Sequence, residues 1–67
     1  MRRAIMTPRQ IVRRLQDEGW EVKRRGPGDH VQFAHASRPG KVTLDMGVRD
    51  IPIGTLRSIF RQAGWDW

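Results

Sequence analysis

Residues 20–34 read WEVKRRGPGDHVQFA, and this stretch decides the fold. Apolar and polar side chains alternate at both of its ends, from Trp20 to Arg25 and from His30 to Ala34. Alternation with a period of two is typical of half-buried strands in an antiparallel sheet. The segment Gly26-Pro27-Gly28-Asp29 between the two runs has the composition of a tight turn, so the sequence predicts a hairpin.

A third alternating run, Lys41 to Met46, extends this pattern. It follows Ser37-Arg38-Pro39-Gly40, a second segment rich in turn residues. Both connections are short enough for hairpins, so the three runs are expected to form a three-stranded meander.

A first helix is predicted before the strands. Thr7, Pro8 and Gln10 form the pattern of a capping box with proline at the first helical position. One apolar stripe is formed by Ile11, Val12 and Leu15. We interpret it as core packing, and Gly19 is expected to end the helix.

A second helix is predicted after the strands, from about Gly54 to Ala63. Apolar residues recur there at helical spacing, and Gly64 is expected to close the helix. Either Thr55 or Asp50 caps its start.

The predicted fold class is α+β, with the order α-β-β-β-α. Each helix has one apolar stripe and the sheet has one apolar face, so the simplest packing lays both helices on that face. The other sheet face is left open. A chain of 67 residues makes one domain, residues 1–67, with a thin core.

The composition points to an anionic partner. Thirteen Lys and Arg against seven Asp and Glu give a net charge of +6, and eleven of the thirteen cations are arginine, which suits bidentate phosphate contacts. Nucleic acid is the first candidate and an acidic protein the second. The chain has no cysteine, which excludes disulfides and thiolate metal sites, and we expect a cytoplasmic protein.

The open sheet face contains the candidate for acid–base chemistry. If Val31 and Phe33 face the helices, His30 faces away, together with Lys23, Lys41, Thr43 and Asp45 on the neighbouring strands. Histidine is the side chain that ionises near neutral pH, so this set could handle a phosphate, although a merely solvated sheet face fits the same pattern. His30 and His35 alternate to opposite faces, which argues against a metal site.

At these motifs the chain resembles the HicA toxins of bacterial type II toxin–antitoxin systems. The resemblance spans nearly the whole length and rests on four segments, which are the helix end at Gly19-Trp20, Gly28-Asp29-His30-x-x-Phe33, Lys41-Val42-Thr43-Leu44, and Ile53-Gly54-Thr55-Leu56-Arg57-Ser58-Ile59 leading to Gln62-Ala63-Gly64.

The resemblance implies a fold like that of double-stranded-RNA-binding domains and ribosome-independent cleavage of mRNA. It also implies that His30 is the essential residue and that a HicB antitoxin covers this histidine. The chain departs from the family pattern at Asp29, where serine is common, and at Asp45-Met46, where many members have a Pro-His pair. Asp29 either stabilises charge on the His30 ring or caps the turn.

We therefore expect an endoribonuclease that uses no metal and no cofactor, with His30 as general base or general acid. The expected RNA contacts are Lys23, Arg24, Arg25, Lys41 and Arg49. The alternative is an RNA-binding module of the same fold without catalysis.

Overall fold

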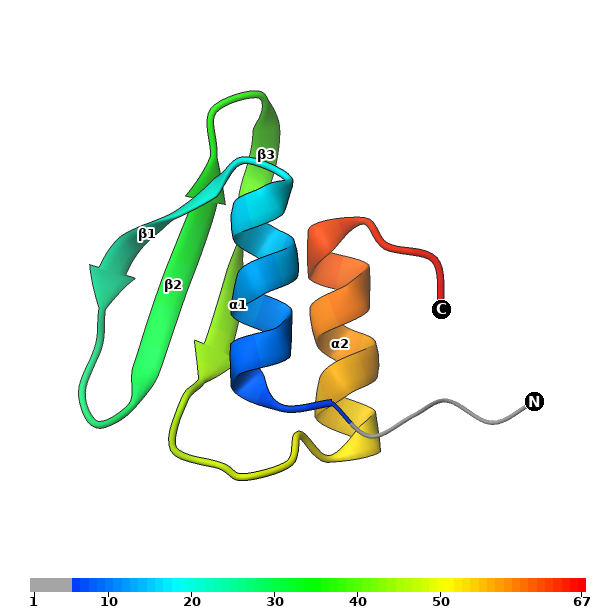
Figure 1. Cartoon of the computed structure of the whole chain (residues 1–67). Coiled ribbons are helices and arrows are strands. Elements are labelled where there is room, and N and C mark those ends of the chain that lie inside the picture. The colour runs from blue at the N-terminus through cyan, green and yellow to red at the C-terminus, as the bar shows by residue number, and fades with distance from the viewer. Residues whose placement is uncertain (1–5) are drawn as a thin grey trace.

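Two helices cover one face of a three-stranded antiparallel sheet (Figure 1). The computed structural model describes residues 6–67, so the first five residues of the predicted domain lie outside it. The elements are α1 (Pro8–Asp17), β1 (Trp20–Arg25), β2 (His30–His35), β3 (Arg38–Asp45) and α2 (Ile53–Ala63). The sheet order is β1-β2-β3, which confirms the predicted α-β-β-β-α fold.

Helix α1 begins at the predicted capping box. The Thr7 backbone N–H donates to Gln10 Oε1 at 2.8 Å, and the Gln10 backbone N–H donates to Thr7 Oγ1 at 3.3 Å. The helix ends just before Gly19, whose φ of +93° only glycine adopts without strain. Both ends of α1 are therefore encoded locally.

A bulge in β1 changes which side chains face the helices. Val22 pairs with Phe33 and Arg24 pairs with Gln32, so Lys23 is an extra residue without a partner. Paired residues point to the same side of a sheet, so Arg24 lies on the open face with Gln32, and Arg25 lies on the helix-facing side opposite Val31. The regular alternation expected from Trp20 to Arg25 is wrong beyond Val22.

The β2–β3 connection is tighter than predicted. The turn is at residues 36–37, and β3 already begins at Arg38, so the expected turn at 37–40 is wrong. His35 explains the difference, because its Nδ1 accepts the Ser37 backbone N–H at 3.0 Å and closes the chain within two residues. Pro39 is tolerated because β3 is an edge strand.

Helix α2 covers the free edge of β3. The Thr43 backbone N–H donates to Gln62 Oε1 at 2.9 Å, and Arg38 Nη1 donates to the Ala63 carbonyl at 3.2 Å. These bonds satisfy groups that an edge strand and a helix end would otherwise leave to solvent. The N-cap residue is Pro52, without a side-chain cap, so neither predicted cap, Thr55 nor Asp50, is correct.

The core lies between the helices and the sheet. Gly64 closes α2 with a φ of +77°, as predicted, and lets the chain turn so that Trp65 packs edge-on against Phe60. The core residues are Ile11, Leu15, Trp20, Val31, Phe33, Val42, Leu44, Ile51, Leu56, Ile59, Phe60, Ala63 and Trp65.

Candidate active site on the open sheet face

His30 is the first residue of β2 and lies on the open face. Its neighbour Val31 is buried against the helices, so the exposed His30 side chain points the other way. The backbone is held from both sides, because the Gly26 N–H donates to the His30 carbonyl and the Met46 N–H donates to the Asp29 carbonyl, each at 2.8 Å. The ring is therefore exposed on a fixed backbone.

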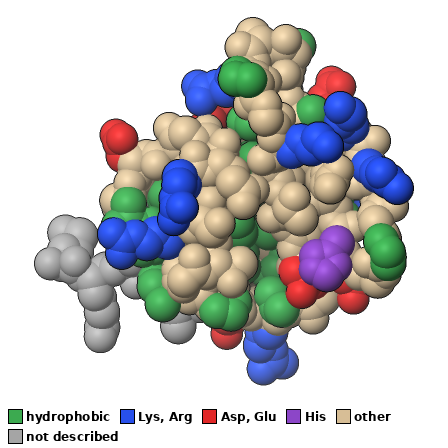
Figure 2. Space-filling model, turned by 180° about the vertical axis from the view of Figure 1, so that it is seen from behind, with side chains coloured by type: hydrophobic (Ala, Val, Ile, Leu, Met, Phe, Trp, Pro, Cys, Tyr) green, Lys and Arg blue, Asp and Glu red, His purple; other side chains and the backbone are tan. Residues whose placement is uncertain are grey.

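The nearest ionisable neighbours of His30 are carboxylates. Asp45 is its cross-strand partner, and Asp29 precedes it in the chain. Figure 2 shows the molecule from behind the view of Figure 1, where a histidine side chain has acidic side chains directly beside it. The sequence predicted that Asp45 shares this face, and the register makes it the direct neighbour of His30.

Gly47 packs against both carboxylates. Its backbone N–H donates to Asp45 Oδ1 at 2.8 Å, and the Asp29 carboxylate lies against its Cα. A Cβ at position 47 would come within 2.5 Å of Asp29 Oδ2. The glycine is therefore needed for Asp29 to lie where it does.

A Gly47→Ala substitution is expected to displace Asp29 and to loosen the backbone beside His30. Because the Asp29 side chain can move, we expect a loss of about 1 kcal/mol in the free energy of unfolding, measured by urea denaturation. Gly54→Ala is the control, since a Cβ there meets nothing within 4 Å and alanine favours the helix. Equal stability of Gly47→Ala and the native chain would contradict the contact.

The five predicted RNA-binding cations do not form one cluster. Arg24 pairs with Gln32 on the open face, and Gln32 is the next residue after His30 along that face of β2. Lys41 is four residues from Asp45 along β3, a distance of about 13 Å. The others are Lys23 in the bulge, Arg25 on the helix-facing side, and Arg49 in the loop after β3.

These cations are available to an anion. Within residues 6–67, the ion pair that the structure contains joins Arg14 to Glu18, so none of the five is in a salt bridge. Arg24 is the one placed closest to His30 on the same face. The alternation in the sequence predicts the reverse, with Arg24 on the side of Val22 and Arg25 on the open face, because the bulge that exchanges them has no clear sequence signal.

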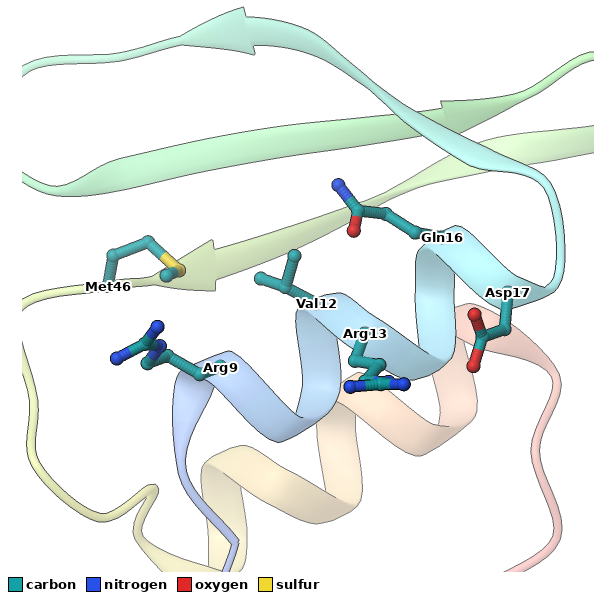
Figure 3. Close-up of a pocket in the computed structure, with 6 residues that line it drawn as sticks. All are labelled: Arg9, Val12, Arg13, Gln16, Asp17 and Met46. Atoms are coloured by element: carbon teal, nitrogen blue, oxygen red, sulfur yellow. The ribbon is translucent and has the colours of Figure 1, made fainter.

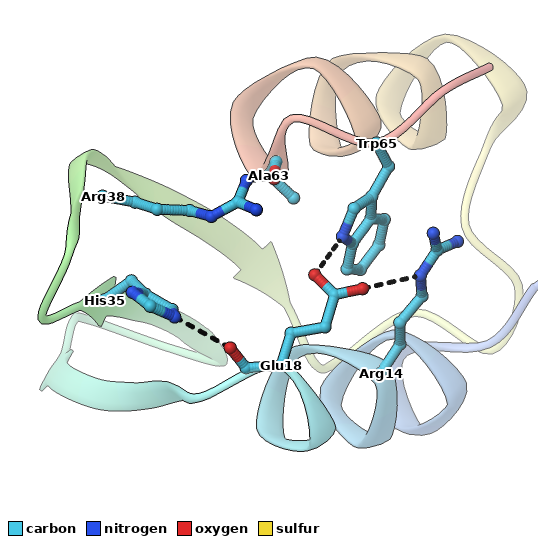
Figure 4. Close-up of polar contacts among 6 residues, drawn as sticks. All are labelled: Arg14, Glu18, His35, Arg38, Ala63 and Trp65. Carbon is cyan, nitrogen blue, oxygen red and sulfur yellow. Dashed lines mark hydrogen bonds and ion pairs between the residues drawn. The ribbon is translucent and has the colours of Figure 1, made fainter.

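His35 serves the fold and not the open face (Figure 4). Its Nδ1 accepts the Ser37 backbone N–H, so its Nε2 carries the proton and donates to the Glu18 carbonyl at 2.8 Å. The ring also packs edge-on against Trp20, with centroids 5.4 Å apart. His35 thus ties the end of β2 to the end of α1, and His30 is the remaining histidine.

Glu18 is the centre of a second contact at the same end of the molecule (Figure 4). Its carboxylate accepts the Trp65 indole N–H at 2.7 Å and the Arg14 Nε–H at 3.3 Å. The hydrogen bond from Trp65 is the main cause that lowers the pKa of Glu18; the Arg14 hydrogen bond and the charges of Arg14 and Arg38 add to it, and burial opposes it.

The lowered pKa of Glu18 predicts a pH dependence of stability. The folded state favours the ionised carboxylate of Glu18. The contribution of Glu18 to the free energy of unfolding is therefore fully present above the pKa that Glu18 has in the unfolded chain. It is lost as the pH falls through the lower pKa that Glu18 has in the folded chain. Glu18→Gln should therefore be less stable than the native chain at pH 7, by about 1 kcal/mol or less because the side chain is 35% exposed. Urea denaturation between pH 7 and pH 2 should show this gap closing, whereas a constant gap would contradict the assignment.

Two further functions find no support in the described part of the chain. Across residues 6–67, no three His, Asp or Glu side chains gather in a way that could hold a metal ion. Neither helix there has the length and apolar character required to cross a bilayer.

A comparison with known protein families matches residues 8–65 to the HicA toxin of bacterial toxin–antitoxin systems. The match runs from the first residue of α1 to Trp65, so it includes both helices, all three strands and His30. No curated protein matches the chain.

Proposed function

Since the chain belongs to the HicA toxin family of bacterial toxin–antitoxin systems, we propose that this toxin acts by cutting messenger RNA. The observation that carries the proposal is His30, an exposed imidazole on a fixed backbone at the open face. Among the hydrogen bonds of residues 6–67, none engages its ring, in contrast to the ring of His35. An imidazole in this state can give or take a proton.

The proposed reaction is an internal transfer within the RNA. His30 removes the proton from a ribose 2′-hydroxyl while water protonates the leaving 5′-oxygen, or His30 protonates the 5′-oxygen while water takes the 2′-hydroxyl proton. In both cases the 2′-oxygen attacks the adjacent phosphorus and the bond to the 5′-oxygen breaks. The products are a 2′,3′-cyclic phosphate and a 5′-hydroxyl, and no metal or cofactor is needed. In the proposed reaction Arg24, which shares the open face, stabilises the negative charge that develops on the phosphate.

The two carboxylates restrict how RNA approaches. Asp29 and Asp45 repel phosphate on their side of His30, so the phosphate would enter from the side of Arg24. The repulsion by Asp45 follows from its position in the register, directly across from His30.

Incubation of purified protein with single-stranded RNA in the presence of a chelator tests the proposal. Cleaved RNA supports the enzyme, and loss of cleavage on chelation would contradict a metal-free reaction. Binding should weaken steeply as salt rises, since the contacts are made by cations to phosphates.

A non-catalytic RNA-binding module is the second candidate. The acidic neighbours of His30 favour it, because they oppose the phosphate at the one place where chemistry would occur. In a gel-shift experiment this module would retard RNA without cutting it, under conditions where the enzyme would produce fragments.

The family implies an antitoxin partner, and we assign this role to a HicB-type protein that covers His30. Because the proposed substrate of the toxin is messenger RNA, the toxin would act in the cytoplasm. Addition of the purified antitoxin should stop cleavage at one equivalent per toxin site.

A further inference from the structure

A groove runs along α1 on the helix side of the sheet (Figure 3). Its volume is about 440 Å³. Val12 and Gln16 point from α1 toward the strands, and Met46 approaches from the end of β3. The lining residues are Arg9, Val12, Arg13, Gln16, Asp17 and Met46.

The groove is partly apolar. Val12 on α1 and Met46 after β3 both line it, and both are only partly buried against the core. Two apolar side chains therefore stay accessible between α1 and the end of β3.

Two cations line the groove. Arg9 and Arg13 are exposed and lie one turn apart on α1. Within residues 6–67, neither of them is in an ion pair. Asp17 is the acidic residue that lines the groove, so the local charge is positive.

We propose that this groove binds an acidic amphipathic segment of a protein partner. Such a segment would place its apolar side chains on Val12 and Met46 and its carboxylates beside Arg9 and Arg13. RNA fits less well, because the groove lining holds aliphatic side chains and no aromatic ring on which a base could stack.

The groove is separate from the open sheet face, so the proposal does not depend on RNA cleavage. It is nevertheless linked to the candidate active site through Met46, whose backbone N–H donates to the Asp29 carbonyl at 2.8 Å. A segment bound at the Met46 end would therefore come close to His30.

A synthetic 18-residue helical peptide, with leucine on one face and glutamate on the other, serves as the probe. Fluorescence anisotropy would measure its affinity for the native chain and for the Arg9→Glu/Arg13→Glu variant. We expect the double substitution to weaken binding by about tenfold or more, because it reverses the charge of one groove wall. Val12→Glu, at a half-buried position that lines the groove, should weaken binding independently by removing an apolar contact.

The matched control is Arg57→Glu/Arg61→Glu, which makes the same change in net charge on α2. It should leave the affinity of the peptide within about threefold of the native value. In an NMR titration, the peptide should shift the amide signals of Val12, Gln16 and Met46.

Three results would overturn the proposal. The first is an equal loss of affinity in the two double variants, and the second is equal binding of a scrambled peptide of the same composition. The third combines two observations: poly(U) displaces the peptide, and the Arg9→Glu/Arg13→Glu variant binds poly(U) more weakly than the native chain does. Together they would mean that the groove binds RNA.

Discussion

A His30→Ala variant is expected to lose RNA cleavage by about 10²–10⁴-fold and to keep its fold. Removing the imidazole removes the group that transfers the proton, and the second histidine, His35, cannot replace it because its ring is engaged by Ser37 and the Glu18 carbonyl. The His30 side chain is exposed, so its loss leaves no cavity. Cleavage rates on single-stranded RNA and far-ultraviolet circular dichroism would measure the two effects.

His35→Ala is the matched control for this prediction. It removes the bond to the Glu18 carbonyl and the contact with Trp20, so it should lower the free energy of unfolding by about 1–2 kcal/mol. Well below the melting temperature it should still cut RNA. A His30→Ala protein that is folded and fully active would exclude the imidazole from the reaction.

A Phe33→Ala variant is expected to be largely unfolded at 25 °C. Phe33 lies on the central strand, is 1% exposed and belongs to the core between both helices. Truncating a buried phenylalanine costs about 3–5 kcal/mol, and a domain of this size has about that much stability in total. Urea denaturation followed by tryptophan fluorescence would measure the loss.

Val22→Ala provides the comparison for Phe33→Ala. Val22 is the cross-strand partner of Phe33 on the same side of the sheet, but 40% of it is exposed, so its truncation should cost less than about 1 kcal/mol. A similar loss in both variants would mean that the uncovered side of β1 is packed as tightly as the centre of the sheet.

The features of the fold that depend on local chemistry were predictable from the sequence. The capping box at Thr7 and the left-handed glycine at position 64 fix helix ends through neighbouring residues. The alternation through Val31 and Phe33 correctly predicted which face of β2 is buried, and it thereby placed His30 on the open face.

The failures arose where a side-chain hydrogen bond or a strand pairing, and not the local composition, decides the structure. The turn at residues 36–37 depends on the His35 ring, whose two nitrogens bond to Ser37 and to the end of α1. The bulge at Lys23 depends on how β1 pairs with β2, and it moved Arg25 away from the open face. Neither feature has a residue pattern that a single sequence would show.

The chemical ends of the RNA fragments test the role of His30 most directly. If His30 moves a proton while a 2′-oxygen attacks phosphorus, mass spectrometry of a cleaved oligonucleotide should find 2′,3′-cyclic phosphate and 5′-hydroxyl ends. Replacing the 2′-hydroxyl by hydrogen at the cut site should then abolish cleavage there. Fragments with 3′-hydroxyl and 5′-phosphate ends, cut equally at the deoxy position, would contradict the proposed reaction.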